Sequence, residues 1–330
     1  MYMKSKNGSS HRISSQKRLN ILIPAHNEEE VLSPLFSKLD ETCKLLYEKF
    51  KLSYIEVIVV DDGSTDQTYE ILCGTSLKYA DLKILSLSRN FGHQNALSVG
   101  FKKCNCDFVV VLDADLQDPP ELINEMLLEW EKGYDVVSAV RSKRDENIFK
   151  KVAYFAFYRI LKFMSSIDIH MDSGDFCLYD KKVIDEINNL TENLKFFRGL
   201  RCWIGFKHGF ITYERKKREF GKASYNFAKL YDLATDGLTS MSIKPLKIAQ
   251  FFSLFYLCIT FFLTIFISFK FINTFTFDYV HLLMLLCLFS FSLVMACIYI
   301  LGAYVGRIYL EVKNRPSAII RDEINVTKFK

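Results

Sequence analysis

The 330-residue sequence lacks the glycine-rich motifs that bind phosphate in two common nucleotide-binding folds. It has no GxxxxGK(S/T) motif and no GxGxxG motif after a predicted strand, so P-loop and Rossmann dinucleotide-binding interpretations lack their phosphate-binding loop. The sequence around Ser64 does not form a nucleophile elbow either, which argues against hydrolase-type chemistry at that serine.

Clustered cysteines and an N-terminal apolar segment are also missing. The nine cysteines are scattered, and Cys104 and Cys106 form a lone CxC pair with no histidines at ligand spacing. This argues against a zinc site and favours free thiols in a reducing compartment. Residues 1–18 are polar and basic and lack the apolar core of a signal peptide. We therefore expect a disordered basic N-terminus and a cytoplasmic soluble part.

Charge is absent from two long stretches, Ile248–Phe269 and Tyr279–Gly306. Each is long enough to cross a bilayer as a helix. The basic residues outside them are Lys244, Lys247, Arg307, Lys313, Arg315 and Arg321. By the positive-inside rule, both ends of this hairpin lie in the cytoplasm. The sequence thus predicts two transmembrane helices within 248–306 and a cytoplasmic tail over 307–330.

The remaining composition is that of a globular protein. Half of the residues are hydrophobic and 15% are aromatic, which excludes a disordered, collagen-like or small disulfide-rich chain. The 43 basic and 38 acidic residues give a net charge of only +5, which does not by itself indicate nucleic-acid binding.

Short apolar runs alternate with helical patterns through the first part of the chain. The runs predicted as strands are 19–24, 54–60, 83–88, 108–112 and 135–140, and the predicted helices are 27–50, 95–103 and one beginning at Pro119. This alternation predicts an α/β layered domain with a mainly parallel sheet, extending over 19–228.

Two further segments combine basic and apolar residues. Residues 148–167 form either a helix lying in a membrane interface or a core helix with snorkelling lysines, and the sequence leaves both open. Residues 229–247, directly before the apolar stretches, are a second candidate for an interfacial helix.

Pairs of acidic residues follow two of the predicted strands: Asp61 and Asp62, then Asp113 and Asp115. In parallel sheets, ligands bind outside the carboxyl ends of the strands. Two carboxylates there can share Mg²⁺ or Mn²⁺ and leave positions for phosphate oxygens. His26 and His93 lie in loops nearby and are expected to be hydrogen-bonding residues rather than ligands.

Seven motifs occur in the order IPAHNEEE, VIVVDDGSTDQT, SRNFGHQNALSVG, VLDADLQDPPEL, MDSGDFCLYD, FFRGLRCWIGF and ERKKREFGKASYNFAKL. This set resembles the family 2 glycosyltransferases, and most of all the group that glycosylates polyprenyl phosphates. GAYVGRIYLEVKNRP and RNFGHQNAL are typical of the bactoprenol glucosyltransferase branch. The resemblance covers residues 19–316 and implies a Rossmann-like GT-A domain, followed by the interfacial helices and the transmembrane hairpin.

The resemblance implies roles for individual motif residues. The nucleotide-sugar would be bound by Pro24, Ala25, Asn27, Glu28, Asp61, Asp62, Asp113 and Ala114, with Asp62 at the base or ribose. The metal would be held by Asp113, Asp115 and Gln117. Catalytic roles would fall to Asp115, Asp175, Arg198 and Arg201. Around the acceptor phosphate would lie Trp203, Arg215, Arg218, Lys222 and Ser224.

The sequence departs from the family pattern at two places. Cys177 follows GDF where an arginine is usual, which would remove one phosphate contact. In Gly221–Tyr225 the usual lysine between serine and tyrosine is missing, and Lys222 is its expected substitute. The role of Asp175 is open: a lipid phosphate has a second pKa of about 6 and is largely a dianion at neutral pH. Asp175 could act as a base, or it could position a sugar hydroxyl or a cation.

The implied activity is the inverting transfer of a hexose, first of all from UDP-glucose, to undecaprenyl phosphate at the cytoplasmic face of a bacterial membrane, for cell-surface glycan modification. A GDP-mannose-dependent synthase is an alternative. A processive polysaccharide synthase needs more spans, and a nucleotide-binding lipid-sugar flippase would need intramembrane charge. The expected partners are the nucleotide-sugar, the lipid phosphate and the membrane, with a homo-oligomer left open and no nucleic acid.

Overall fold

The computed structural model describes residues 17–141, 173–192, 195–214, 246 and 280–327, with scattered residues between 251 and 265. The chain divides into two compact units. The first unit contains every strand described, and the second contains the long helix α10 (Val280–Lys313).

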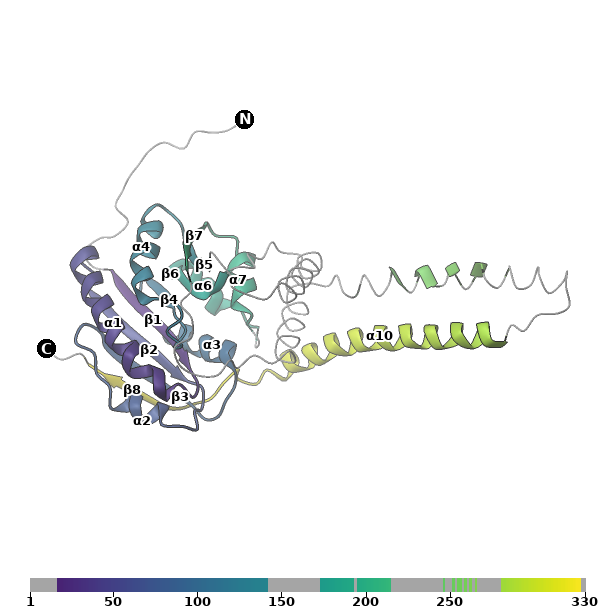
Figure 1. Ribbon diagram of the computed structural model, residues 1–330, viewed down its shortest axis with the longest axis horizontal. Coiled ribbons are helices and arrows are strands. Elements are labelled where there is room, and N and C mark those ends of the chain that lie inside the picture. Colours follow the sequence, from purple (N-terminus) through teal and green to yellow (C-terminus); the bar gives the residue numbers. More distant parts are fainter. Residues whose placement is uncertain are drawn as a thin grey trace, which may run out of the picture. The chain divides into compact units, whose positions relative to one another are not determined.

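One eight-stranded sheet forms the centre of the first unit (Figure 1). Its strands are β1 (Arg18–Ala25), β2 (Tyr54–Asp61), β3 (Asp81–Leu87), β4 (Phe108–Val111), β5 (Val136–Arg141), β6 (Ser173–Asp180), β7 (His208–Tyr213) and β8 (Ile320–Val326). Their order is β7-β5-β6-β4-β1-β2-β3-β8. Strands β4, β1, β2 and β3 are parallel, as are β5 and β7, whereas β6 and β8 run antiparallel to their neighbours. The predicted α/β fold with a mostly parallel sheet is confirmed.

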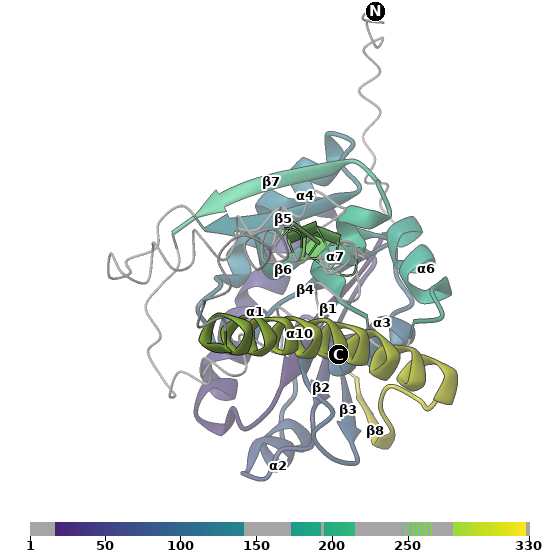
Figure 2. The ribbon, with the colours of Figure 1, turned by 90° about the vertical axis from the view of Figure 1, so that its right-hand side faces the viewer.

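Helices cover both faces of this sheet (Figure 2). They are α1 (Glu29–Phe50), α2 (Thr68–Cys73), α3 (His93–Lys103), the 3-10 helix η1 (Pro120–Leu122), α4 (Ile123–Glu131), α6 (Lys181–Asn189) and α7 (Phe197–Trp203). One apolar cluster joins α1, α2 and α4 to one face, and a second joins α3, α6 and the start of α7 to the other. This is the layered arrangement expected when both faces of a parallel sheet are buried.

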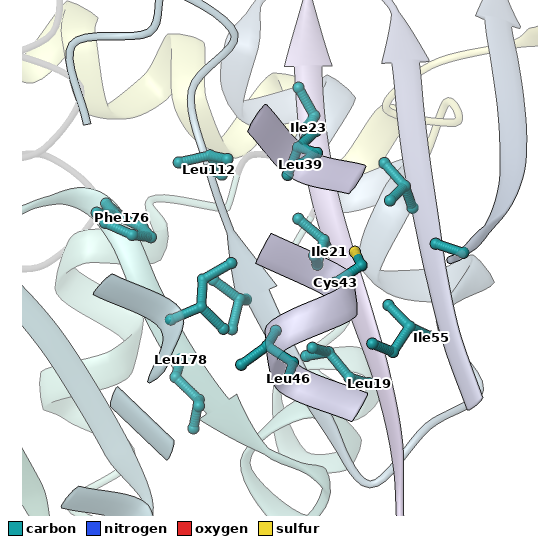
Figure 3. Close-up of a cluster of buried hydrophobic side chains, with 14 of the residues drawn as sticks. Leu19, Ile21, Ile23, Leu39, Cys43, Leu46, Ile55, Leu112, Phe176 and Leu178 are labelled. Carbon is teal, nitrogen blue, oxygen red and sulfur yellow. The ribbon is translucent and has the colours of Figure 1, made fainter. Parts of the chain in front are cut away.

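The alternation of side chains along β1 explains why it is the central strand. Leu19, Ile21 and Ile23 belong to the cluster under α1, while Leu22 belongs to the opposite cluster. Figure 3 shows the first three beneath the α1 residues Leu39, Cys43 and Leu46, which recur at helical spacing. Because both sides of β1 are buried, and every buried side chain between Leu19 and Ile23 except Asn20 is apolar, the strand lies in the interior of the sheet.

A close approach of α3 to β1 fixes the position of that helix. A Cβ added to Gly100 would lie 2.2 Å from Cδ1 of Leu22. Only glycine lets the helix lie this close to the strand. The N-terminus of α3 is thereby held near the carboxyl ends of the parallel strands.

The register of the parallel strands brings the acidic turns to one edge. Ala25 pairs with Asp61, and Asp61 pairs with Ser86 on the next strand. On the other side of β1, Leu22 pairs with Val111, just before Asp113. The acids identified from the sequence therefore share the carboxyl edge of the sheet.

The sequence predicts that residues 307–330 form a cytoplasmic tail, separate from the catalytic domain. In the structure, residues 320–326 of this segment instead form β8, which pairs with β3 in the sheet. Its exposure alternates along the strand, with Ile320, Ile324 and Val326 partly buried and Arg321, Glu323 and Asn325 exposed. So short a charged strand gives little signal in the sequence, and it forms because β3 offers an unpaired edge.

Among the described residues, one helical stretch, Leu286–Lys313 within α10, is long and apolar enough to cross a membrane. It extends beyond the predicted end of the second span at Gly306. The predicted interfacial helix at 148–167 lies outside the described residues. So does nearly all of 229–247, and only scattered residues of the predicted first span, 248–269, are described.

Candidate active site

The loop after β1 and the loop after β2 are tied together by the predicted motif residues. Asn27 has a left-handed backbone, with φ 55°. Its amide donates to Ser64 Oγ at 3.0 Å, and its side-chain oxygen accepts from Thr65 N at 2.8 Å. The Glu28 amide donates to Thr68 Oγ1 at 2.9 Å. Asn27 and Glu28 thus shape this edge of the site through their backbones and through the Asn27 amide group.

Asp61 and Asp62 are almost fully buried, at 1% and 4% exposure. Asp61 accepts from Ser64 N at 3.1 Å and from Ser86 Oγ at 3.0 Å. Asp62 accepts from the amides of Phe91 and Gly92, at 2.7 and 2.8 Å. Burial raises the pKa of Asp62, and the two amide hydrogen bonds only partly offset that effect. In this structure both oxygens of Asp62 organise the loop after β3, whereas a contact with a base or ribose was expected.

Gly63, which follows Asp61 and Asp62, lies where the backbone conformation and the surrounding space both require glycine. Gly63 has φ +64°, and a Cβ there would lie 2.3 Å from the carbonyl carbon of Arg89. The loop after β2 therefore packs directly on the backbone of the loop after β3. Pro24 and Ala25, also predicted at the site, are buried at the end of β1, and the Ala25 carbonyl accepts from Asp62 N at 2.8 Å.

The DAD motif follows β4. Asp113 Oδ1 is buried and has no hydrogen-bond partner among the described residues. Burial raises the pKa of Asp113 to about 6; the charges of Asp175, Asp118 and Asp115 act in the same direction and His93 opposes them. Asp115 Oδ1 accepts from the Gln117 backbone at 3.1 Å, which makes a tight turn. Ala114 is buried between the two acids.

Asp175, on β6, lies at the centre of an ion-pair cluster. Arg198 donates to both of its oxygens, from Nε at 2.8 Å and from Nη2 at 2.7 Å. Nε2 of His93 lies 3.2 Å from Asp175 Oδ2. The Asp175 side chain is only 6% exposed, whereas those of His93 and Arg198 are 35% and 34% exposed. The cluster therefore presents two basic groups to solvent above a buried carboxylate.

The charges of this cluster shift the protonation of its members. Burial alone would raise the pKa of Asp175, but the Arg198 charge and the hydrogen bonds from Arg198 and His93 hold it well below its usual value. Burial lowers the pKa of His93, but the carboxylate of Asp175 only 3.2 Å away and the charge of Asp113 outweigh this effect, so the pKa of His93 is raised. Asp175 thus behaves as a permanent anion that orients its two basic neighbours.

Other predicted residues lie elsewhere. Arg201 is 1% exposed, and its Nη1 donates to the Gly174 carbonyl at 3.0 Å, so a direct phosphate contact does not fit its position. Trp203 is 58% exposed. Cys177 is fully buried with its Sγ 3.3 Å from Ser138 Oγ. Arg215, Arg218, Lys222 and Ser224 lie outside the described residues.

The acids after β4 fit a divalent cation, although the described residues contain no group of three or more histidine, cysteine or carboxylate side chains that could hold one. Asp113 has a buried oxygen that finds no hydrogen-bond partner in the part of the chain that the structure describes, and three more carboxylates raise its pKa. A hard cation would offset this negative charge, and it could take its remaining ligands from phosphate oxygens or water. Asp113, Asp115 and the side-chain oxygen of Gln117 are suitable donors.

His93 is a member of the site that was not predicted from the sequence. It was expected to be a hydrogen-bonding loop residue, but it is the first residue of α3 and contacts Asp175. The next residue also joins the start of α3 to the start of α7, because Gln94 Oε1 accepts from Phe197 N at 3.1 Å. The sequence feature that could have identified His93 is its motif, RNFGHQN. The contact of this motif with the GDF and FFRG motifs is made only in the folded chain, so it could not be predicted from the sequence.

Comparison with known proteins agrees with this geometry. The model of the family described as "Glycosyl transferase family 2" matches residues 20–188. The Bacillus subtilis protein YkcC, described as an uncharacterized glycosyltransferase, is 40% identical over 95% of this chain and 96% of its own length. An uncharacterized glycosyltransferase of Synechocystis, sll0501, is 37% identical over 92% of this chain and 95% of its own length.

A relative with a described activity is the prophage-derived bactoprenol glucosyl transferase of Shigella flexneri. It is 33% identical over 92% of this chain and 97% of its own length. The acids at the carboxyl edge of a mostly parallel α/β sheet, the family match and the full-length relatives agree: this chain is a glycosyltransferase and belongs to glycosyl transferase family 2.

Proposed function

We propose that this enzyme transfers a hexose from a nucleotide-sugar to a polyprenyl phosphate, with inversion at the anomeric carbon. Glucose from UDP-glucose and undecaprenyl phosphate are the first candidates. The proposal is supported by several relatives named bactoprenol glucosyl transferase, each 33% identical to this chain over more than nine-tenths of its length.

The observation that carries the proposal is the cluster of His93, Asp113, Asp175 and Arg198 at the carboxyl edge of the sheet. It combines a buried carboxylate lacking a partner among the described residues with two basic side chains held by a second carboxylate. Anionic groups developing at a leaving diphosphate are stabilised by such pre-positioned charges. A diphosphate donor and a phosphate acceptor are the substrate types that this arrangement suits.

Arg198 is the residue of the cluster best placed to contact phosphate. Asp175 holds its guanidinium through two hydrogen bonds, and a third of the side chain is exposed. A guanidinium fixed in this way loses little entropy when it binds a phosphate oxygen. Mg²⁺ or Mn²⁺, held by Asp113, Asp115 and Gln117, would neutralise charge on the diphosphate.

The protonation state of Asp175 supports a direct displacement without a protein base. The acceptor phosphate is largely a dianion near neutral pH, so one of its oxygens can attack the anomeric carbon while the bond to the nucleoside diphosphate breaks. Asp175 has both oxygens bound to Arg198 and a strongly lowered pKa. Of its two possible roles, positioning a cation is the one we propose.

We further propose that the enzyme is an integral membrane protein with its catalytic domain in the cytoplasm. α10 has the length and composition of a span. The segment after it, β8, pairs with β3 in the sheet that also contains β1. If α10 crosses the membrane, the chain between β7 and β8 must therefore cross an even number of times, which agrees with a hairpin.

The deciding experiment is a donor screen. Purified full-length protein in detergent is given undecaprenyl phosphate and one nucleotide-sugar at a time, with and without EDTA, and the glycolipid is identified by mass spectrometry. A UDP-glucose-dependent hexosyl lipid that Asp113→Asn does not form supports the proposal. A product formed only from GDP-mannose would identify the mannose synthase, and nucleotide binding without any glycolipid would favour the non-catalytic flippase.

A further inference from the structure

The C-terminal strand reaches the donor side of the sheet through one side chain. Nη2 of Arg321, on β8, donates to Ser86 Oγ at 2.9 Å, and Ser86 Oγ donates to Asp61 Oδ2 at 3.0 Å. A serine hydroxyl has one proton to donate and lone pairs to accept with, so both bonds can form at once. The other oxygen of Asp61 accepts from Ser64 N at 3.1 Å. An unbroken relay thus leads from β8 to the loop after β2.

The local irregularity of β8 explains why Arg321 points this way. Ser86 pairs with Asp322 and Leu87 pairs with Ile320, so the register shifts between these two pairs and Arg321 has no counterpart on β3. Beyond the shift the pairing continues, with Ser88 N donating to the Ile319 carbonyl at 2.9 Å. A bulge of this kind redirects a side chain out of the normal alternation.

The guanidinium of Arg321 is held from three sides, although half of the side chain is exposed. Its Nε donates to Asp322 Oδ2 at 2.8 Å, and it lies over the Tyr69 ring on α2 at 5.0 Å. The Tyr69 hydroxyl in turn donates to Asp322 at 3.3 Å. Arg321 therefore has a defined orientation toward Ser86.

At the other end of the relay lies a carboxylate that needs compensation. Asp61 is 1% exposed and Ser86 is fully buried, and a buried charge is costly unless hydrogen bonds and opposite charge offset it. The loop that Asp61 anchors also contacts the first loop of the site, because Ser64 Oγ accepts from Asn27 N at 3.0 Å. Movement of Asp61 would disturb both loops.

We propose that Arg321 is a positioning residue of the donor site, which fixes the loop after β2 through Ser86 and Asp61 and thereby sets the affinity for the nucleoside diphosphate. This inference rests on the proposed function in taking the donor to be a nucleotide-sugar. In the sequence, α10 lies between the C-terminal strand β8 and the other strands of the sheet. If the proposal is right, this strand is nevertheless part of the donor site.

The test compares two substitutions on the same strand in the full-length protein. Arg321→Gln breaks the relay, whereas Glu323→Gln removes ion pairs to Lys103 and Lys83 at 2.6 and 3.8 Å without touching Ser86. Losing one charge-assisted link at an exposed arginine should raise the donor KM and weaken UDP binding about three- to tenfold. For Arg321→Gln, kcat and the acceptor KM should stay near wild type, and Arg321→Lys should recover part of the donor affinity. Glu323→Gln should leave donor affinity unchanged.

A second variant keeps the test decisive if Arg321→Gln does not fold. Ser86→Ala removes the relay hydroxyl but leaves β8 its backbone pairing with β3 and the contacts of Arg321 with Asp322 and Tyr69, so it should give the same donor-side loss. The double variant should be no worse than the more affected single variant, since both break one path. Unchanged UDP affinity in Ser86→Ala or Arg321→Gln overturns the proposal. An equal loss in Glu323→Gln overturns it too, because strand docking alone would then be responsible.

Calorimetry of UDP binding tests the role of Arg321 without requiring any transfer to a lipid, so a failure of this proposal can be told apart from a failure of the proposed function. If wild type binds UDP but forms no polyprenyl-linked product, the proposed acceptor fails and the relay comparison can still be made. If the donor screen identifies another nucleotide, the same comparison is made with its diphosphate.

Discussion

The two halves of the carboxyl edge neutralise their acids in different ways. Around β2 and β3, Asp61 and Asp62 accept mainly from backbone amides and a serine of neighbouring loops. Around β4 and β6, Asp175 is paired with the side chains of Arg198 and His93, and Asp113 keeps one oxygen without a hydrogen bond among the described residues. The first half uses carboxylates to shape loops, whereas the second keeps charge available for a ligand.

From this contrast we propose that the half around β2 and β3 shapes the donor site and that the half around β4 and β6 performs the chemistry. Carboxylates whose two oxygens each accept a hydrogen bond from a neighbouring loop or strand fix the geometry of the backbone around them. A buried carboxylate with spare capacity is costly to fold and is expected at a functional position. Substitutions in the two halves should therefore have different signatures.

The largest effect should come from Asp113→Asn. This change removes the buried charge with little change of shape. We expect turnover to fall by on the order of 100-fold or more, because Asp113 is proposed to hold the cation that neutralises charge on the leaving diphosphate. The melting temperature should stay close to wild type or rise, since an uncompensated buried charge is removed. Turnover and thermal unfolding measured side by side test this, and a variant with full activity in EDTA would contradict the metal assignment.

A smaller loss is expected from Asp175→Asn. The amide can keep one contact with Arg198 but cannot hold it through two charged hydrogen bonds, so the guanidinium that we propose binds phosphate becomes mobile. Turnover should fall about 10- to 100-fold, the range for one hydrogen bond to a charged group.

Steady-state kinetics of Asp175→Asn beside Arg198→Lys check this interpretation. If Asp175 only orients Arg198, the two variants should lose similar activity and the double variant little more. A much deeper loss in Asp175→Asn alone would instead indicate that Asp175 acts as a base.

The loop-shaping half should respond through stability. Gly63→Ala places a methyl group against the Arg89 backbone at a positive φ, so it combines backbone strain with overpacking and should cost about 2–4 kcal/mol. Gly133→Ala is the matched control, because Gly133 also has a positive φ but no atom within 4 Å of the added Cβ. Denaturant unfolding should show the larger loss in Gly63→Ala. Equal losses would mean that the close packing of the two loops contributes nothing.

The smallest effect concerns the pH dependence of β8 docking. The hydrogen bond from Lys103, and the charges of Lys103 and Lys83, lower the pKa of Glu323. A carboxyl group whose pKa is lower in the folded state stabilises the fold above its unfolded pKa, about 4.3, and this contribution disappears as pH falls through the folded value. Partly exposed pairs contribute about 0–1 kcal/mol.

Thermal unfolding of wild type and Glu323→Gln at several pH values measures that contribution. Wild type should be slightly more stable at pH 7, and the difference should shrink steadily as pH falls below about 4.3. A difference that does not shrink on acidification would show that the ion pair is not its source.

The alternation of apolar runs and helices, and the acids that end the runs, were enough to predict the α/β sheet and the edge where its acids gather. These features are local: a buried parallel strand needs a continuous apolar run such as 57–60, and its carboxyl end needs a polar turn. The ordered motifs also indicated the family before any contact was known.

The pairing of charges at the site, by contrast, was decided by the tertiary structure. His93, Asp175 and Arg198 come together only because β6 enters the sheet antiparallel beside β4, and nothing in the local pattern specifies that order of strands. The same holds for Arg201, for which the motif implied a catalytic role but which is buried, with its guanidinium donating to the Gly174 carbonyl.

The pairing of the C-terminal strand β8 with β3 is the clearest example of a feature that only the tertiary structure decided. Residues 320–326 are too short and too charged to predict a strand alone, and Arg321 counted only as one of the basic residues flanking the hairpin. A strand at a sheet edge takes its hydrogen bonds from its neighbour, so its existence depended on β3 having a free edge and on where α10 ends. The sequence by itself determined which residues can carry charge at the site, and the packing of distant segments determined which of them meet.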